Sequence, residues 1–288
     1  SLKAMVMVHK IHKELGIRIP LTEFFNKPTI KGQAAYIEKA EKKSCSILPL
    51  AEEKEYYALS SAQQRIYILQ RLDEASTGYH ITHTLKLKGE VDRKRFTGIF
   101  RQIIARHESL RTSFEMIGGE PVQRIHKRVE FEIEYYDSAL PKAFAGGPGG
   151  RFSRKEPPSP FDLSRAPLLQ VILIKTAPGE HLLVVDMHHI VTDGTSVDIL
   201  VKEFSALYMG KELPAVHIRY KDYSQWQSRR RREGEDDSVD KQEAYWSERM
   251  WGEPPVLELP LDYRRPAVQG FTGSRLCFEI GEGETLSL

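Results

Sequence analysis

The chain has 288 residues, of which 40% are hydrophobic, and its 42 basic residues nearly balance its 40 acidic ones, for a formal charge of +2. This length allows one large domain or two smaller ones. The balanced charge argues against a nucleic-acid partner, because such binders usually carry a basic excess on one element. The basic run at residues 229–232 is followed at once by acidic residues and predicts a solvated loop or helix end.

No apolar stretch approaches the length of a membrane span, and the sequence shows no signal peptide, so no membrane partner is expected. Cys45 and Cys277 are far apart and have no metal-ligand spacing. They argue for a reducing compartment, the cytoplasm, and against a disulfide scaffold or a zinc site. The chain begins at Ser1 inside an apparent helix start, so we expect it to be part of a longer polypeptide.

Residues 1–40 predict a small helical unit. Gly16 is expected to end the first helix. One face of this helix is formed by apolar residues at three- and four-residue steps: Leu2, Met5, Val8, Ile11 and Leu15. Thr29 is the expected cap of a second helix that continues through Ile37. Residues 41–56 are charged, contain Pro49 and lack periodicity, which is typical of a linker.

From residue 57 onward the pattern is mixed α/β. Helices are expected at residues 61–72, with Ile66 and Leu69 among the core positions, at 94–108, and through 197–207. Strands are expected at residues 82–88, 129–136, 168–174 and 182–187, and the last two are apolar enough to be covered on both faces. Residues 141–160 are rich in glycine and proline and predict a flexible surface loop.

Residues 187–194 (MHHIVTDG) carry the candidate chemistry. His188 and His189 end an apolar strand, and because neighbouring strand residues point to opposite faces, their roles must differ. Asp193 and Gly194 form a turn that opens a helix near Ser196, whose positive end would favour neutral imidazole, the form that accepts a proton. The structural alternative is one core histidine bonded to a backbone carbonyl, followed by an ordinary Asp-Gly turn.

Four blocks, HHxxxDG included, resemble the core motifs of the condensation domains of nonribosomal peptide synthetases, in the family's order. They are residues 61–67 (SAQQRIY), 106–114 (RHESLRTSF), 187–194, and 220–226 (YKDYSQW). Residues 160–168 (PFDLSRAPL) and 259–266 (LPLDYRRP) also resemble family stretches. Taken singly, Arg65, Glu108 and Arg111 would serve as ion-pairing residues that hold helices to a sheet.

The resemblance implies an α/β fold similar to a chloramphenicol acetyltransferase lobe, with a mixed sheet flanked by helices, preceded by part of a small carrier helical bundle. Residues 1–40 would be the C-terminal part of a peptidyl carrier domain, 41–56 the linker, and 57–288 the N-terminal lobe of the condensation domain. In the family the active site lies in a tunnel between two lobes, and the motifs of the second lobe do not occur in this chain.

The implied reaction is amide formation, in which the α-amine of a carrier-bound acceptor attacks the thioester carbonyl of a carrier-bound donor. His189 would orient the amine or take its proton. Asp193 would hold the turn, Gly194 would allow the backbone geometry, and His188 would pack or bond inside the lobe. No metal ligand is expected among these residues.

Residues 1–5 (SLKAM) resemble the start of the second helix of a peptidyl carrier domain, and residues 15–16 and 24–30 also match. In that family the serine carries a 4'-phosphopantetheine arm, so Ser1 is the expected attachment residue. On chemistry alone, a serine at a helix N-terminus is more often only a cap. The implied partners are donor and acceptor carrier domains, downstream synthetase domains and a phosphopantetheinyl transferase.

Two other functions stay open. An epimerisation domain also follows a carrier and uses HHxxxDG, and exchange of the substrate α-proton with solvent would favour it. A non-catalytic docking module would only bind carriers, and unchanged activity after His189→Ala would favour it. A heterocyclisation domain is disfavoured because that family replaces the histidine pair with aspartates.

Overall fold

The computed structural model describes residues 2–40, 48–137, 144–146, 152–154, 159–233, 237–253, 257–264, 278 and 280–287. The chain divides into two compact units, Ser1–Pro49 and Leu50–Leu288. Within the described ranges, no helix is both long and apolar enough to cross a membrane. Cys45 and Cys277 lie outside these ranges, so the absence of a disulfide or a zinc site remains a prediction.

The N-terminal unit is helical, as predicted: α1 (Leu2–Leu15), α2 (Leu21–Asn26) and α3 (Ile30–Lys39). Thr29 is the cap of α3, since its side chain accepts a hydrogen bond of 3.1 Å from the Gly32 backbone. The buried Gln33 amide donates to the carbonyls of Phe24 and Lys27 and ties α3 to α2. The predicted apolar face of α1 is only partly covered, because a unit this small has little interior; Met5 is 52% exposed.

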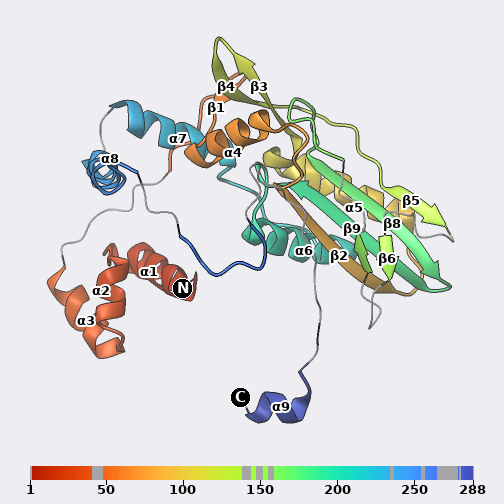
Figure 1. Cartoon of the computed structure of the whole chain (residues 1–288), viewed down its shortest axis with the longest axis horizontal. Coiled ribbons are helices and arrows are strands. Elements are labelled where there is room, and N and C mark those ends of the chain that lie inside the picture. Colours follow the sequence, from red (N-terminus) through yellow and green to blue (C-terminus); the bar gives the residue numbers. More distant parts are fainter. Residues whose placement is uncertain are drawn as a thin grey trace. The chain divides into compact units, whose positions relative to one another are not determined.

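The larger unit contains a mixed four-stranded sheet, the architecture expected from the sequence (Figure 1). The strands lie in the order β2 (His80–Lys88), β9 (Glu180–His188), β8 (Leu169–Ala177) and β5 (Glu134–Asp137). β2 and β8 are antiparallel to β9, and β5 is parallel to β8. The strand expected at residues 129–136 is therefore shorter and lies at one edge of the sheet.

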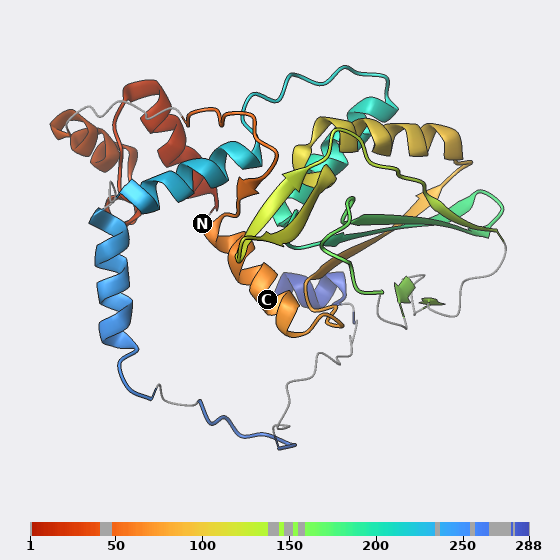
Figure 2. The same cartoon turned by 90° about the horizontal axis from the view of Figure 1, so that it is seen from above.

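Two helices cover one face of this sheet, α5 (Arg93–Arg106) and α6 (Gly194–Tyr208), as Figure 2 shows. They enclose the main core together with alternate residues of β9, Leu183, Val185 and Met187. The intervening residues Leu182 and Val184 pack on the other face with Ile172 and Ile174 of β8. β8 and β9 are thus buried on both faces, as their apolar runs predict.

A second, three-stranded sheet has the order β1 (Tyr57–Ala58), β4 (Glu120–Ile125) and β3 (Thr112–Ile117). The helix α4 (Ser61–Leu72) begins after a capping box formed by Ser60 and Gln63. A smaller core joins these elements to the turn after β9, and its buried members are Leu59, Tyr67, Phe114, Leu163, Leu168 and Ile190. The core position expected at Leu69 is wrong: Leu69 is exposed, and Tyr67 is buried instead.

The remaining elements agree with the sequence expectations only in part. α5 ends at Arg106, and the 3-10 helix η1 (Glu108–Arg111) follows it. The basic run at residues 229–232 lies at the end of a helix, as predicted, in α7 (Tyr220–Glu233). The helices α8 (Asp237–Arg249) and α9 (Glu282–Ser287) complete the helices of the described part. Within the predicted loop at residues 141–160, β6 (Phe144–Gly146) pairs with β7 (Phe152–Arg154); most of its other residues lie outside the described ranges.

Candidate active site

The histidine block lies where β9 leads into α6. His188 is the last residue of β9, and Asp193 is the N-cap of α6. The helix therefore begins at Gly194, two residues earlier than the sequence predicts. The backbone N–H of His189 donates a 2.7 Å hydrogen bond to the carbonyl of Tyr79, so the turn is held from the β2 side as well.

His188 is fully buried, and its hydrogen bonds define its tautomer. Its Nδ1 accepts the backbone N–H of Ile190 at 3.1 Å. The amide nitrogen of Gln70 donates to three backbone carbonyls, so the Gln70 oxygen must be the partner of His188 Nε2, at 3.3 Å. Nε2 therefore carries the hydrogen. Burial lowers the pKa of His188 to about 4, with His80 and His189 adding to the effect, so the ring is neutral near pH 7.

His189 has a different environment, because its side chain is exposed. Its Nδ1 lies 2.8 Å from the carbonyl oxygen of Thr192. Since a carbonyl oxygen only accepts, Nδ1 carries the hydrogen, and in the neutral ring Nε2 holds the lone pair. No residue in the described ranges forms a hydrogen bond with Nε2. The geometry thus presents a proton-accepting nitrogen to solvent.

Asp193 caps α6 through Ser196. Its Oδ1 accepts from the Ser196 backbone N–H at 2.8 Å and from the Ser196 hydroxyl at 2.7 Å, while its own N–H donates back to that hydroxyl. These hydrogen bonds lower the pKa of the Asp193 carboxyl, with the nearby His189 adding to the effect. The carboxylate therefore stabilises the start of α6 directly after the histidines.

Gly194 does not have the backbone conformation that the sequence led us to expect. It is the first residue of α6, its φ is not positive, and a Cβ added there would have no described atom within 4 Å. The absence of a side chain at residue 194 therefore leaves open space at the start of α6 and relieves no backbone strain.

Two of the other motif blocks, residues 106–114 and 220–226, meet around a buried glutamate, Glu108 in η1. Its carboxylate lies 3.5 Å from the side-chain nitrogens of both Arg111 and Lys221, and it also pairs with Arg219. These contacts join residues 106–114 to residues 220–226. They confirm the ion-pairing roles expected of Glu108 and Arg111, whereas Arg65 makes no ion pair with a residue that the structure describes.

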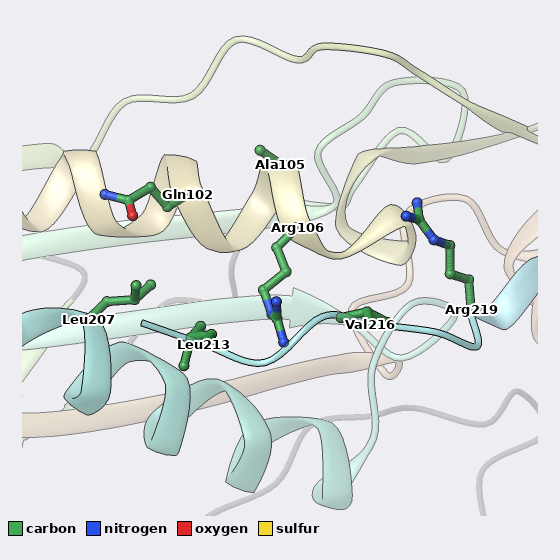
Figure 3. A pocket seen from close by; sticks show the side chains of 7 residues that line it. All are labelled: Gln102, Ala105, Arg106, Leu207, Leu213, Val216 and Arg219. Carbon is green, nitrogen blue, oxygen red and sulfur yellow. The ribbon is translucent and has the colours of Figure 1, made fainter. Parts of the chain in front are cut away.

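A cavity of about 380 Å³ opens elsewhere, between α5 and the chain that follows α6 (Figure 3). Its lining residues are Gln102, Ala105, Arg106, Leu207, Leu213, Val216 and Arg219. Figure 3 shows Arg106 extending from α5 toward the segment that carries Leu213. Arg106 is paired with Glu203 there, and Arg219 with Glu108, so neither guanidinium lacks a carboxylate partner. None of the predicted site residues lines this cavity.

Neither a metal site nor the carrier serine lies in the described part of the chain. Among the described residues, no group of three or more histidines, cysteines, aspartates or glutamates could hold a metal ion. Ser1 lies outside the described residues. α1 begins at the next residue, Leu2, so the expected attachment residue directly precedes a helix, and a serine hydroxyl is a group to which a phosphopantetheine arm could be joined.

Several residues around the site escaped the sequence prediction. Gln70 and Thr192 fix the two histidine rings, and Tyr79 holds the turn. Gln70 is 118 residues from His188, and no local pattern indicates such a contact. Thr192 acts through its carbonyl, which is independent of its side chain.

Comparison with known proteins agrees with the motifs. The family model of the condensation domain matches residues 53–288, and that of the phosphopantetheine attachment site matches residues 1–37. Bacitracin synthase 2 of Bacillus licheniformis is 44% identical over 97% of this chain, and tyrocidine synthase 2 of Brevibacillus parabrevis is 42% identical over 96%. The chain spans only 10% and 8% of their respective lengths.

Solved structures share the fold. The X-domain from teicoplanin biosynthesis, in its complex with OxyB, is 26% identical with a TM-score of 0.64, over 77% of this chain and 49% of that one. The first condensation domain of the calcium-dependent antibiotic synthetase, in complex with a substrate analogue, is 21% identical with a TM-score of 0.55, over 70% of this chain and 49% of that one. Because the sequence identity to the second structure is only 21%, this similarity shows that the fold is shared and nothing more.

Proposed function

Because the chain belongs to the condensation-domain family of nonribosomal peptide synthetases, with a phosphopantetheine-attachment segment before it, we propose that it forms amide bonds between carrier-bound substrates. A donor acyl or peptidyl group would be transferred from its thioester to the α-amine of an aminoacyl acceptor. The observation that carries this proposal is the exposed His189 ring, whose Nδ1 is held by Thr192 and whose Nε2 is available to accept a proton.

The reaction needs a neutral amine. A free α-amine has a pKa of roughly 8 and is largely protonated near neutrality. His189 Nε2 orients the amine or takes its proton as the C–N bond forms. The C–S bond then breaks, and the proton lost by the amine passes to the leaving sulfur, so that the donor arm is released as a thiol. Proton transfer of this kind is typically worth about 10² to 10⁴ in rate. The positioning of two tethered substrates contributes as well.

The neighbouring residues support this role without touching the reacting atoms. His188 holds the turn from inside through Ile190, and Asp193 fixes the start of α6 through Ser196. Gly194 leaves room beside that helix start for substrate.

The carrier part supplies the donor. Residues 1–40 form the C-terminal part of the carrier domain, 41–56 the linker, and 57–288 the N-terminal lobe of the condensation domain. A phosphopantetheinyl transferase would join 4'-phosphopantetheine to the Ser1 hydroxyl, and the thiol of that arm holds the acyl group as a thioester. An acceptor carrier and further synthetase domains would be the other partners.

One observation favours a second function, a non-catalytic docking module. The X-domain likeness comes from a structure described as a complex with OxyB, so a protein of this fold has a second protein as its partner. In that case His189 would have no catalytic role. Epimerisation is the third outcome that the test below separates.

The test uses the protein at its full natural length, with donor and acceptor carriers loaded as thioesters and product followed by mass spectrometry. We expect wild type to form the amide and a folded His189→Ala variant to lose it. Equal product from both would assign the module to docking. Absence of product with exchange of the donor α-proton in deuterated water would assign it to epimerisation.

A further inference from the structure

A buried polar group lies behind the histidine pair, on β2 and β9. His80 is directly opposite His188 in the register, and Thr82 is opposite Asp186. The four side chains therefore lie on one face of the strand pair. The Asp186 side chain is 1% exposed and that of His80 3%. A carboxylate buried this deeply is costly unless it is paired and hydrogen-bonded.

Both oxygens of this carboxylate are bonded. His80 Nδ1 donates to Oδ2 at 2.8 Å, and the Thr82 hydroxyl donates to Oδ1 at 2.7 Å. An ionised carboxylate only accepts, so Nδ1 of His80 carries a hydrogen. Asp186 thereby fixes both the rotation and the tautomer of the His80 ring.

The His80 ring in turn contacts His188. Its centroid is 6.1 Å from that of His188, edge to face, and 4.7 Å from that of Phe161, on which it stacks. Phe161 belongs to the block at residues 160–168 and also meets His188 edge to face, at 6.1 Å. Asp186 therefore directly holds one of the rings that pack against His188, and a second, Phe161, stacks on that ring.

Building on the proposed function, we infer that His80 and Asp186 are positioning residues of the active site. Asp186 orients His80, and His80 with Phe161 holds the His188 ring so that its Nδ1 accepts the Ile190 N–H. Ile190 directly follows His189, so a rotated His188 ring releases the backbone that presents His189. A displacement of about 1 Å at a reacting group can cost about 10²-fold in rate.

Asp186→Ala is the direct test. It leaves His80 and Thr82 without their acceptor, and we expect kcat to fall by about tenfold or more while KM for the acceptor carrier stays within about twofold. Asp186→Asn is the conservative rescue, because its amide oxygen can accept from His80 and its NH₂ can donate to the Thr82 hydroxyl. It should restore kcat to within about threefold of wild type.

The ring nitrogens of His188 give a readout that loss of stability alone would not change. In long-range ¹H–¹⁵N spectra we expect a single Nε2–H tautomer in wild type and in Asp186→Asn, and a mixture of tautomers in Asp186→Ala. Lys86→Gln is the matched control, since it removes an exposed 2.8 Å ion pair with Glu180 between the same two strands. It should alter neither kcat nor the spectrum.

Three results would overturn the inference. One is a folded Asp186→Ala variant with the kcat and His188 spectrum of wild type. Another is an equal loss of kcat in Asp186→Asn and Asp186→Ala, which would assign the effect to buried charge rather than to hydrogen bonding. If Asp186→Ala does not fold, Thr82→Val replaces it as the test, because it removes one of the two hydrogen-bond donors to Asp186 at an accessible position. A Thr82→Val variant with the kcat and His188 spectrum of wild type would then overturn the inference. Wild type that makes no product contradicts the proposed function, while the His188 spectra still decide the positioning role.

Discussion

His188 and His189 are adjacent in the chain, and the fold gives them opposite environments. Strand alternation alone predicts that they cannot share one face, and the structure places His188 in the interior and His189 at the surface. Both nitrogens of the interior ring form hydrogen bonds, whereas the exposed ring is bonded to the described part of the chain only through Nδ1. A proton can therefore be accepted at one histidine without disturbing the core around the other.

The buried histidine makes stability depend on pH. Its folded pKa is about 4, below the ordinary 6.5, so between these values the unfolded chain binds a proton that the folded chain does not. The free energy of unfolding therefore falls as pH falls through this window, and we expect His188 to account for about 2 kcal/mol between about pH 7 and about pH 5.

Urea unfolding of wild type and His188→Gln at the two pH values measures this effect. The variant is less stable at both, but its stability should depend less on pH by the amount given above. Identical pH dependence in the two proteins would show that the ring titrates normally and is not desolvated.

Gly194 gives a prediction that separates folding from activity. A Cβ at this position has free space around it, and alanine suits a helix start, so Gly194→Ala should change the free energy of unfolding by less than about 0.5 kcal/mol. If the open space beside α6 belongs to substrate, product formation should drop by about tenfold. Thermal unfolding measures the stability of the variant, and the assay with loaded carriers measures its product formation. A stable Gly194→Ala variant with full activity would show that Gly194 is not part of the substrate site.

At the scale of elements, two aspartates at helix starts predict opposite responses to the same substitution. Asp193 uses one oxygen for both of its bonds from Ser196, so asparagine can replace it, whereas alanine should cost about 1 kcal/mol. Asp222 uses both oxygens, accepting from the backbone N–H of Ala51 and of Arg219. Asparagine there turns an NH₂ toward one of these donors and should cost about 2 kcal/mol.

Denaturant unfolding of Asp193→Asn, Asp193→Ala and Asp222→Asn measures the contrast. We expect Asp193→Asn to be about as stable as wild type, Asp193→Ala to be moderately destabilised, and Asp222→Asn to be destabilised most. If asparagine were equally harmless at both positions, the two-oxygen role of Asp222 in anchoring α7 would be wrong.

The sequence predicts the elements whose periodicity is long and regular. β2, β8, β9, α5 and α6 all occur within a few residues of the expected bounds, and the Thr29 cap is confirmed. The start of α6 was missed because the Asp-Gly pair reads as a turn, although Asp193 and Ser196 have the spacing of a cap. The hairpin of β3 and β4 was missed because its strands are short and half polar.

Part of the candidate site can likewise be predicted from the sequence and part cannot. The histidines and Asp193 are visible as a motif, but their supports depend on contacts that only the folded chain creates. His80 reaches Asp186 because β2 pairs with β9 in one register, and a shift of one residue would turn His80 to the other face. Register of that kind follows from the whole core rather than from any local pattern.

At the scale of the whole molecule, the proposed function assigns one step to each of the two compact units, loading of the donor to the first and its transfer to the second. Under this proposal, attachment at Ser1 would need only the N-terminal unit, whereas transfer would need the larger unit with His189. We therefore expect Ser1→Ala to abolish the mass increase caused by a phosphopantetheinyl transferase, and His189→Ala to leave that increase unchanged.

A donor supplied as a small soluble thioester bypasses the carrier and completes the separation. It should restore amide formation to Ser1→Ala and leave His189→Ala inactive, because under the proposed function the first variant would lack only the arm that delivers the donor and the second would lack the proton-accepting group. Wild type with the same soluble donor is the reference for both. Rescue of His189→Ala would mean that delivery, rather than chemistry, depends on this histidine, and failure to rescue Ser1→Ala would mean that the carrier does more than deliver the donor.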